Sequence, residues 1–307
     1  MAGGRGEYGQ ELYDPYENHA VKVDFGVEVL GGAAAAYCNG KIYITGGSPI
    51  NETSNTPKWH IALDLVQIVD PEHPETRYKH GRKMSSPRTL HTAVCVNDTK
   101  LVLCGGINGT ENMALYYTDT CDVYDTTTDT YVTMVPPMRL PRAVSDHAAV
   151  QLDGIYYSIG GTGPTRGNCS PILSDVYAFN WTSSSWSTEA PLLRAREDHA
   201  AIALDHIILV CGGYPPSGEC ETYDPANNTT WTAAPPLLYN RSDHQMMLIG
   251  DGADAQVLLF AGHCWKDESR QNSCPRGTTQ LTGLSLMNSV EVYDWKGKHS
   301  SIREGNR

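Results

Sequence analysis

One pattern recurs along this chain and restricts it to a small set of folds. The clearest copy, residues 198–237, begins with two short apolar segments, HAAIAL and IILVC, separated by a tight polar turn. Gly212 and Gly213 end the second segment, and Tyr223 and Trp231 then mark two more short segments around a polar turn. Apolar runs this short and rich in Ile, Val, Leu and Ala predict buried strands rather than helices. The copy therefore predicts four antiparallel strands.

The landmarks of this unit return along the rest of the chain. Further copies start near residues 33, 91, 147 and 244. Glycine pairs end their second segments at 46/47, 105/106 and 160/161, with Ala261-Gly262 in the last copy. With the pair at 212/213 included, the intervals are 59, 55, 52 and 49 residues. Successive glycines permit positive φ and close approach of neighbouring backbone where a Cβ would clash. We expect the chain to leave each sheet there, and Trp231 to pack between neighbouring units.

This self-similarity predicts the architecture. A period near fifty residues with four short strands in each indicates a β-propeller. The paired glycines, the Tyr-Asp that follows them and the Trp at a fixed offset resemble the repeat of kelch proteins, over roughly residues 12–302. The resemblance implies an all-β fold, a kelch-type β-propeller of four-stranded antiparallel blades.

The two ends of the chain leave the closure of the ring open. Residues 11–25 resemble the third and fourth strands of a unit whose first two strands are absent, which gives five full repeats and an N-terminal half blade. Kelch propellers commonly close as six-bladed rings with one blade shared between the termini, which removes exposed sheet edges. We expect a five- or six-bladed ring over residues 11–302, a flexible segment at 1–10 and a tail at 303–307, or a piece of a longer protein.

Charge and hydropathy exclude some classes of partner. The chain carries 23 Lys and Arg against 35 Asp and Glu, a net charge of −12, and no basic cluster interrupts this balance. That argues against a nucleic-acid or anionic-membrane surface. No apolar run approaches the ~20 residues of a membrane span, and the N-terminal residues do not resemble a signal peptide. As encoded, the chain is expected to be soluble and cytoplasmic.

Asn-X-Ser/Thr triplets favour a different location. Eight occur, all in expected turns, loops or linkers, where a glycan acceptor must lie. β-Turns also concentrate Asn, Ser and Thr, which raises the number of chance matches. An extracellular location therefore stays open beside the cytoplasmic one. The main glycosylation candidates are Asn51, Asn108, Asn168, Asn180 and Asn228, and the other triplets begin at Asn97, Asn227 and Asn240.

The nine cysteines do not decide between these locations. Cys264 and Cys274 bracket a loop across which a disulfide is expected in an oxidising compartment. Buried cysteine otherwise acts as a small apolar residue. That role is expected for Cys104 and Cys211 before glycine pairs, and for Cys121 and Cys220 at equivalent repeat positions. The other three cysteines, which have no assignable partner, are Cys38, Cys95 and Cys169.

Arginine and aspartate precede the first strand of several units. In a propeller, the starts of the innermost strands gather around one end of the central channel. The resemblance to kelch domains implies that arginines there grip acidic peptide segments, because a guanidinium group pairs with a carboxylate bidentately. Alternatively, these side chains tie the blades together by repeated hydrogen bonds. The candidate ligand-binding residues are Arg88, Arg142, Arg194, Arg196, Arg241, Asp146, Asp198 and Asp243.

The sequence offers little for catalysis. Asp-His dipeptides beginning at Asp146, Asp198 and Asp243 contain ligand types for a metal, but adjacent strand residues point to opposite faces, so at most one of each pair faces the channel. Kelch-type propellers include enzymes such as galactose oxidases, yet no match to their site motifs can be placed here. No GxSxG or phosphate-binding loop occurs either. We expect no metal, no cofactor and no enzymatic activity.

The segments after the glycine pairs vary while the scaffold repeats. They cover residues 48–60, 107–119, 162–174, 214–218 and 263–288. Long, dissimilar loops on one face of a rigid repeat commonly carry recognition. Their aromatic side chains either anchor a partner or cap their own blades. These are Tyr116, Tyr117, Tyr214 and Trp265.

Together these features predict a non-enzymatic scaffold that binds another protein or a peptide, with an acidic peptide as the ligand that the arginines favour. The chain resembles the substrate-recognition propeller of Kelch-like ubiquitin-ligase adaptors and actin-associated kelch proteins, although it lacks the BTB and BACK domains of the adaptors. A second hypothesis is an extracellular, glycosylated kelch module for adhesion or reception. A third is a kelch-type enzyme such as a galactose oxidase-like oxidase.

Overall fold

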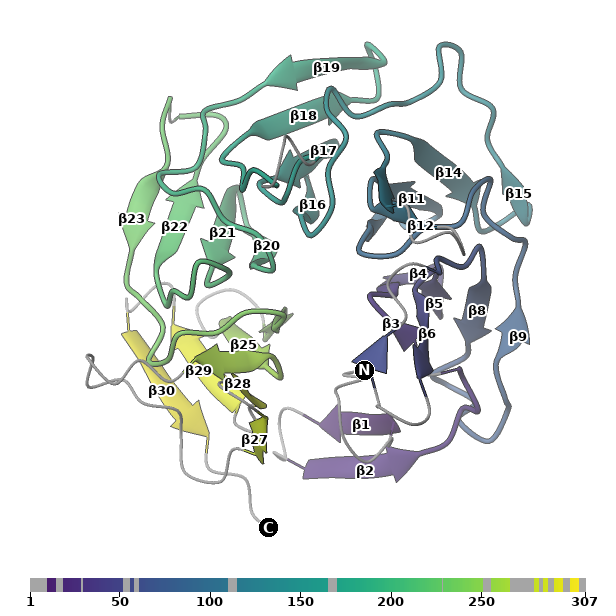
Figure 1. Cartoon of the computed structure of the whole chain (residues 1–307), viewed down its shortest axis with the longest axis horizontal. Helices are drawn as coiled ribbons and strands as arrows, with labels where there is room; N and C mark the ends of the chain where they lie inside the picture. The colour runs from purple at the N-terminus through teal and green to yellow at the C-terminus, as the bar shows by residue number, and fades with distance from the viewer. Residues whose placement is uncertain are drawn as a thin grey trace.

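The computed structural model describes most of the chain. The described residues are 10–14, 19–28, 30–51, 56–57, 61–109, 115–164, 170–227, 229–250, 255–265, 279–281, 284–286, 290–294 and 299–303. In them the chain forms strands, turns and connecting segments around a central axis (Figure 1). Within this part of the chain, no helix has the length and apolarity that a membrane span requires.

Five four-stranded antiparallel sheets, called blades 1 to 5, form most of the ring, and their strands follow chain order from the axis outward (Figure 1). Blade 1 holds β4 (Ala34–Cys38), β5 (Lys41–Thr45), β8 (Val66–Val69) and β9 (Lys79–His80). Blade 2 holds β10 (Thr92–Val96), β11 (Lys100–Cys104), β14 (Cys121–Asp125) and β15 (Thr130–Tyr131).

The remaining blades repeat this order. Blade 3 holds β16 (Ala148–Leu152), β17 (Ile155–Ile159), β18 (Val176–Asn180) and β19 (Ser185–Thr188). Blade 4 holds β20 (Ala200–Leu204), β21 (Ile207–Cys211), β22 (Cys220–Tyr223) and β23 (Thr232–Ala234). Blade 5 holds β24 (Gln245–Ile249), β25 (Gln256–Phe260), β29 (Val290–Asp294) and β30 (His299–Arg303). The expected all-β propeller with four-stranded blades is confirmed.

A sixth place in the ring is occupied by the N-terminal hairpin. Strands β1 (Gln10–Asp14) and β2 (His19–Val23) pair antiparallel with each other and lie between blade 5 and blade 1 (Figure 1). This is the half blade that the sequence predicts. In the described residues the ring therefore consists of five complete blades and one two-stranded place.

The variable segments after the glycine pairs are partly regular. They contain β6 (Ser48–Asn51) and β7 (Thr56–Pro57), β12 (Ile107–Gly109) and β13 (Leu115–Tyr117), and β26 (His263–Trp265), β27 (Thr279–Leu281) and β28 (Leu284–Leu286). Strand β3 (Leu30–Gly31) pairs with β6. Small ladders thus extend from one end of the blades instead of irregular loops.

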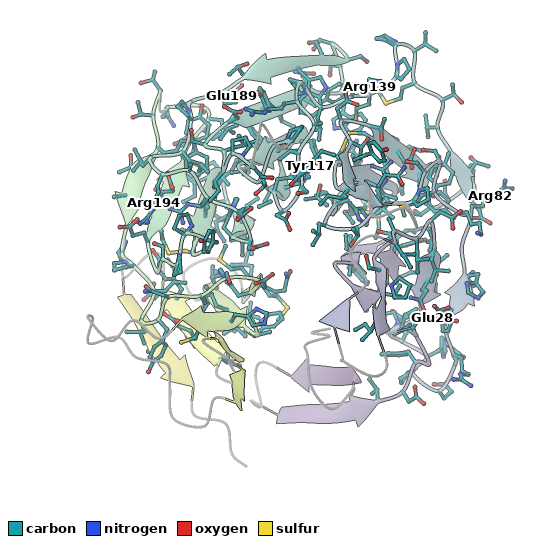
Figure 2. The ribbon with its side chains drawn as sticks, viewed as in Figure 1. Glu28, Arg82, Tyr117, Arg139, Glu189 and Arg194 are labelled. Atoms are coloured by element: carbon teal, nitrogen blue, oxygen red, sulfur yellow. A yellow bond between two sulfur atoms is a disulfide. The ribbon has the colours of Figure 1, made fainter. Side chains whose placement is uncertain are left out.

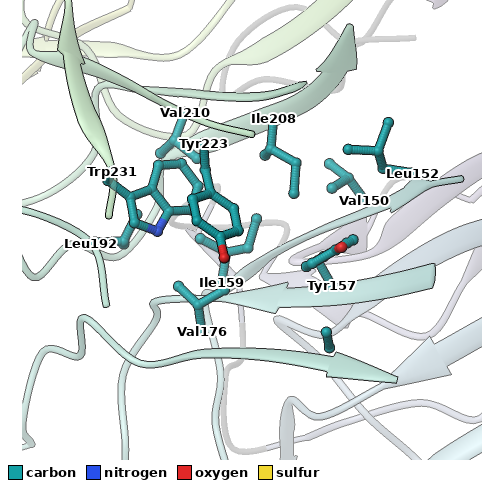
Figure 3. Close-up of a cluster of buried hydrophobic side chains, with 11 residues drawn as sticks. Val150, Leu152, Tyr157, Ile159, Val176, Leu192, Ile208, Val210, Tyr223 and Trp231 are labelled. Atoms are coloured by element: carbon teal, nitrogen blue, oxygen red, sulfur yellow. The ribbon is translucent and has the colours of Figure 1, made fainter. Parts of the chain in front are cut away.

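The hydrophobic core lies between neighbouring blades. One cluster joins blades 3 and 4 through Tyr157 and Ile159 on one side and Val210, Tyr223 and Trp231 on the other (Figure 3). Trp231 is 3% exposed, stacks on Tyr223 at 5.2 Å between ring centroids, and donates its Nε1–H to Ala190 O at 2.9 Å. Equivalent clusters join blades 1 and 2, 2 and 3, and 4 and 5. As expected, Trp231 acts as a wedge between blades.

The first glycine of each pair lies directly against the next blade. Gly160 has φ +60°, and a Cβ on it would lie 2.7 Å from Arg196 O and 2.8 Å from His199 Cε1 of the next blade. Its neighbour Gly161 donates its N–H to the same Arg196 carbonyl at 2.8 Å. A side chain would force the blades apart at this point, so glycine is required by both conformation and space.

Disulfides correct the expectation for six cysteines. Cys104 and Cys121, and likewise Cys211 and Cys220, are cross-strand partners that form disulfides within blades 2 and 4. Cys38 of blade 1 is bonded to Cys95 of blade 2. Cysteines at the adjoining ends of the second and third strands face each other, so they bond instead of packing as separate apolar side chains.

The three remaining cysteines are Cys169, Cys264 and Cys274, and the sequence predicts a disulfide between the last two. Cys264 is buried and disulfide-bonded. Its predicted partner Cys274 lies outside the described residues, as does Cys169. The pairing across residues 264–274 therefore stays a prediction.

Two glycines of blade 3 offer a matched test of this packing. Gly160→Ala should lower the free energy of unfolding by about 3 kcal/mol, because the new methyl group meets both an unfavourable φ and the next blade. Gly154→Ala, in the β16–β17 turn, has φ +76° but open space around the new Cβ, and should cost only about 1 kcal/mol. Urea unfolding measures both. Equal losses would show that conformation alone selects glycine at position 160.

Candidate functional site

A continuous chain of backbone hydrogen bonds runs from blade to blade beside the central axis. It joins the residues just before the first strands, here called the inner ring: Gly32, Leu90, Asp146, Asp198 and Asp243. The N–H of Leu90 donates to Gly32 O at 2.8 Å, Asp146 to Leu90 at 3.1 Å, Asp198 to Asp146 at 3.1 Å, and Asp243 to Asp198 at 2.8 Å. The three predicted aspartates are thereby brought together in one rigid arc.

The inner ring requires an unusual backbone conformation. All five members have positive φ, between 54° and 64°. Asp tolerates this left-handed region better than most residues because its short polar side chain can bond locally. Ser145 Oγ donates to Asp146 Oδ2 at 2.6 Å, and Ser242 Oγ donates to Asp243 Oδ2 at 3.1 Å. The repeated Ser-Asp pairing explains part of the recurrence of Asp at these positions.

The aspartates and a neighbouring glutamate form an acidic group. Burial, followed by repulsion from Asp243, Asp146 and Glu197, raises the pKa of Asp198 well above the ordinary range. Burial likewise raises the pKa of Asp146, whose carboxyl group hydrogen-bonds to that of Asp198. Burial and the charges of Asp146 and Asp243 raise the pKa of Glu197 to about 7. The axis end of blades 3 to 5 is thus short of positive charge.

The histidines that follow the inner ring face away from this acidic group. His147 and His199 are buried between blades, each with Cε1 2.8 Å from the Cβ position of the preceding blade's first paired glycine. Burial lowers the pKa of His147 to about 3 and lowers that of His199 well below its ordinary value, so both rings are neutral at pH 7. In the described part of the chain, no three His, Cys, Asp or Glu side chains are grouped to hold a metal ion.

Three of the five predicted arginines are not available to a ligand. Arg88 and Arg241 are fully buried and Arg196 is 3% exposed. Arg196 donates to Gly212 O at 2.5 Å, to Glu219 O at 3.0 Å and to Glu221 Oε1 at 2.8 Å, all within its own blade. The expectation that these guanidinium groups line the channel is wrong, because the side chains turn back between strands and donate to carbonyl and carboxylate oxygens of the protein.

Each buried arginine forms an ion pair with an acidic residue of its own blade. Each lies against an acidic residue one place into the third strand, and the pairs are Arg88–Asp122 at 3.4 Å, Arg196–Glu221 at 2.8 Å and Arg241–Glu291 at 3.1 Å. Blade 3 has Val144 and Tyr177 at the equivalent positions, and blade 1 has Leu30 and Gln67. Where the arginine is absent the acid is absent too, as expected if the buried charge must be compensated.

The other two arginines are partly exposed but are also paired. Arg142 donates to Asp175 Oδ2 at 2.9 Å with 31% of its side chain exposed. Arg194 donates to Glu219 Oε2 at 3.0 Å and lies on the outer part of blade 4, away from the axis (Figure 2). Neither joins the acidic group at the inner ring.

The segments after the glycine pairs share an end of the ring with the inner ring. Two-way backbone bridges join Thr89 to Ile107, Ser145 to Thr162, Glu197 to Tyr214, and Ser242 to His263. This end is called the loop face. His263 Nδ1 lies 3.0 Å from Asp243 Oδ2, which ties β26 to the acidic group.

Two of the predicted aromatic anchors are exposed on the loop face. Tyr116 is 60% exposed and Tyr214 is 38% exposed. Tyr117 is half-buried, lies on the axis side of the ring (Figure 2), and donates its hydroxyl to Ser170 Oγ at 3.3 Å. The side chain of Trp265 lies outside the described residues. Tyr116 and Tyr214 are therefore exposed at the loop face, whereas Tyr117 bridges neighbouring loops.

The glycosylation candidates are spread over both ends of the ring. Asn180 is exposed, and Asn108 is half-buried on the loop face. Asn51 lies in β6, but its side chain is not described. Asn168 and Asn228 lie outside the described residues.

Comparison with known families agrees with this geometry. A model of the KLHDC2/KLHL20/DRC7 Kelch-repeats domain matches residues 30–213, from β3 to the second glycine after β21. The chain belongs to this family. The kelch assignment suggested by the paired glycines is confirmed.

Curated relatives are also kelch proteins. Beta-scruin of Limulus polyphemus is 28% identical over 192 residues, which cover 62% of this chain and 20% of the relative. Kelch-like protein 23 of Homo sapiens is 25% identical over 236 residues, covering 76% of this chain and 38% of the relative. Kelch-like protein 25 of Xenopus laevis is 30% identical over 141 residues, covering 42% and 22%. The matches span well under half of each relative's length.

A solved structure supports the fold alone. The structure of YjhT superposes with a TM-score of 0.67 at 13% sequence identity, covering 90% of this chain and 84% of that one. The likeness extends over nearly the whole ring.

Sequence reasoning missed two features of the site. Glu197 was not singled out, although it directly precedes Asp198 and would lie on the same end of the strand. The disulfides were missed although Cys104 and Cys211 occupy the last place of a second strand and Cys121 and Cys220 the first place of a third. That spacing in an antiparallel pair makes them cross-strand neighbours.

The structural role of the buried arginines can be tested in blade 4. Arg196→Val should lower the free energy of unfolding by about 4 kcal/mol, because it leaves Glu221 buried without its partner. The double variant Arg196→Val/Glu221→Tyr, which introduces the residue types that blade 3 has at these two positions, should recover much of this loss. Arg194→Ala, at an exposed pair, should change stability by less than about 1 kcal/mol. Denaturant unfolding gives all three values.

An Arg196→Val protein of unchanged stability would contradict this structural role. It would return Arg196 to the candidates for ligand binding.

Proposed function

We propose that this kelch propeller binds a protein or peptide partner across its loop face and catalyses no reaction. The observation that carries the proposal is the exposure of Tyr116 and Tyr214 on segments anchored beside the inner ring. Aromatic side chains that are exposed on a rigid scaffold are typical anchors of protein interfaces. The named relatives, Kelch-like proteins and a scruin, support a binding role over an enzymatic one.

The charges of the loop face favour a basic partner segment. The arginines expected to hold an acidic peptide are buried or already paired. Asp146, Glu197, Asp198 and Asp243 instead lie together, and burial followed by their mutual repulsion raises the pKa of Asp198 and Glu197. A lysine or arginine of a partner would relieve that repulsion, whereas a carboxylate would add to it. The proposed ligand is therefore positively charged, whereas the arginines in the sequence led us to expect a negatively charged one.

A pair of labelled peptides tests this preference. The first carries lysine and arginine around a tyrosine, and the second replaces each basic residue by glutamate. We expect the basic peptide alone to bind in fluorescence anisotropy, more weakly as salt rises. Glu197→Gln combined with Asp243→Asn should weaken it about tenfold, which corresponds to ~1.4 kcal/mol.

The control for this experiment lies at the other end of the ring. Asp205→Asn changes an exposed carboxylate in the β20–β21 turn, at a positive φ that Asn also tolerates. It removes one carboxylate, as each of the two changes in the double variant does, without touching the loop face, and should leave binding unchanged. Tighter binding of the acidic peptide would overturn the proposed partner chemistry.

The disulfides favour an oxidising compartment for this chain. Three bonds join the six cysteines of blades 1, 2 and 4, and Cys264 is bonded as well. Structural disulfides persist in secreted and extracellular proteins and are rare in the cytosol. We therefore favour an extracellular kelch binding module over a cytosolic ubiquitin-ligase adaptor or an actin-associated protein.

Alkylation of the unreduced protein checks the compartment. The chain isolated from the cells that make it should leave Cys38, Cys95, Cys104, Cys121, Cys211 and Cys220 unmodified by iodoacetamide under denaturing conditions. All six should react after reduction, as read by peptide mass. Reaction of these cysteines before reduction would favour the cytosolic alternatives.

A further inference from the structure

The end of the ring opposite the loop face is built from turns. The first residue of β11, Lys100, pairs with the last residue of β14, Asp125. In blade 3, Ile155 at the start of β17 pairs with Asn180 at the end of β18. The turn between the first two strands and the turn between the last two therefore lie at the same end of each blade. This end is called the turn face.

Two Asn-X-Thr triplets begin in or directly before turns of this face, each with its acceptor exposed. Asn97 lies in the β10–β11 turn at φ +51°, and Thr99 Oγ1 donates to Asn97 O at 3.2 Å. Asn180 is the last residue of β18, at the start of the β18–β19 turn, and its Oδ1 accepts the N–H of Thr182 at 2.8 Å and of Ser183 at 3.3 Å. In the described structure, the Nδ2 of neither residue donates a hydrogen bond to the protein, so both amide nitrogens face solvent.

Two other triplets, at Asn227 and Asn240, are placed less favourably for glycosylation. Asn227 is exposed on the turn face, but its Nδ2 donates to Asp224 Oδ2 at 2.9 Å. Asn240 is half-buried, and the two residues that complete its triplet, Arg241 and Ser242, are 0% and 3% exposed. A glycan at Asn240 would have to displace the packed linker between blades 4 and 5. The structure thus separates the triplets that local sequence treats alike.

We propose that Asn97 and Asn180 are N-glycosylated and that the turn face carries these glycans. The proposal rests on the proposed extracellular location, because the donor is a polyprenyl-diphosphate-linked oligosaccharide of the secretory pathway. The Asn Nδ2 forms a bond to the anomeric carbon of the first sugar and loses one proton. The bond from that carbon to the diphosphate oxygen breaks, and the polyprenyl diphosphate leaves. No oxidation or reduction takes place.

Glycans at these two positions have a consequence for binding. Asn97 lies in the turn between the two innermost strands of blade 2, beside the central axis, and Asn180 lies at the start of the outer turn of blade 3. A branched, hydrated sugar at each position covers both the inner and the outer part of the turn face. Protein partners are then directed to the loop face, where Tyr116 and Tyr214 are exposed.

The test is site-by-site glycan mapping on the full chain secreted from a eukaryotic host behind a cleavable signal peptide. Treatment with peptide N-glycosidase converts each occupied Asn to Asp, which peptide mass spectrometry detects. We expect conversion at Asn97 and Asn180 and none at Asn240. Thr182→Ala should abolish conversion at Asn180, whereas the matched control Thr182→Ser keeps the triplet and should retain it. Thr182 is exposed, so neither change should affect folding.

The outcomes separate this proposal from the proposed function. A secreted chain with its six cysteines bonded but with Asn97 and Asn180 unconverted overturns the glycan sites and leaves the extracellular binding module standing. Conversion at Asn240 as complete as at Asn180 overturns the selection by exposure. Free cysteines in the protein from its own cells overturn the location, and with it the setting in which the sugar could be added.

Discussion

Each of blades 1 to 4 is fixed to the next through a backbone contact that only glycine permits. The N–H of the second paired glycine donates to a carbonyl just before the next blade's first strand, from Gly47 to Arg88 through to Gly213 to Arg241. The contact does not depend on the side chain of the residue that accepts the bond. Gly106 donates to the carbonyl of Val144 in blade 3, whereas the other acceptors are arginines. A repeated backbone geometry therefore sets the angle between blades, and side chains are left to vary.

The fold could be predicted because its constraints are local and repeated. Glycine pairs, short apolar segments and turn residues each report a conformation that the chain adopts within a few residues, and five copies make a chance match improbable. The half blade at residues 11–25 followed from the same comparison between units. The way the ring closes could not be predicted from that comparison, because the position of β1 and β2 between blades 5 and 1 depends on contacts between residues far apart in sequence.

The candidate site was predicted less well, because it depends on where side chains turn. Asp146, Asp198 and Asp243 meet at the inner ring as expected. Arg88, Arg196 and Arg241 stand close by in sequence, yet they extend between strands to carbonyl groups and to acids of the third strand. The missing clue was that these acids and arginines occur together in blades 2, 4 and 5 and are both absent from blades 1 and 3. Comparing pairs of positions between repeats would have shown it.

The inner ring is symmetric in its backbone but not in its chemistry. Gly32 and Leu90 take the places in blades 1 and 2 that aspartate takes in blades 3, 4 and 5, at nearly the same φ. The negative potential is therefore displaced to one half of the ring. An extended segment laid across the axis would meet carboxylates at one end and an apolar side chain at the other. Such a surface distinguishes the two directions in which a peptide can lie, which a rotationally uniform ring cannot do.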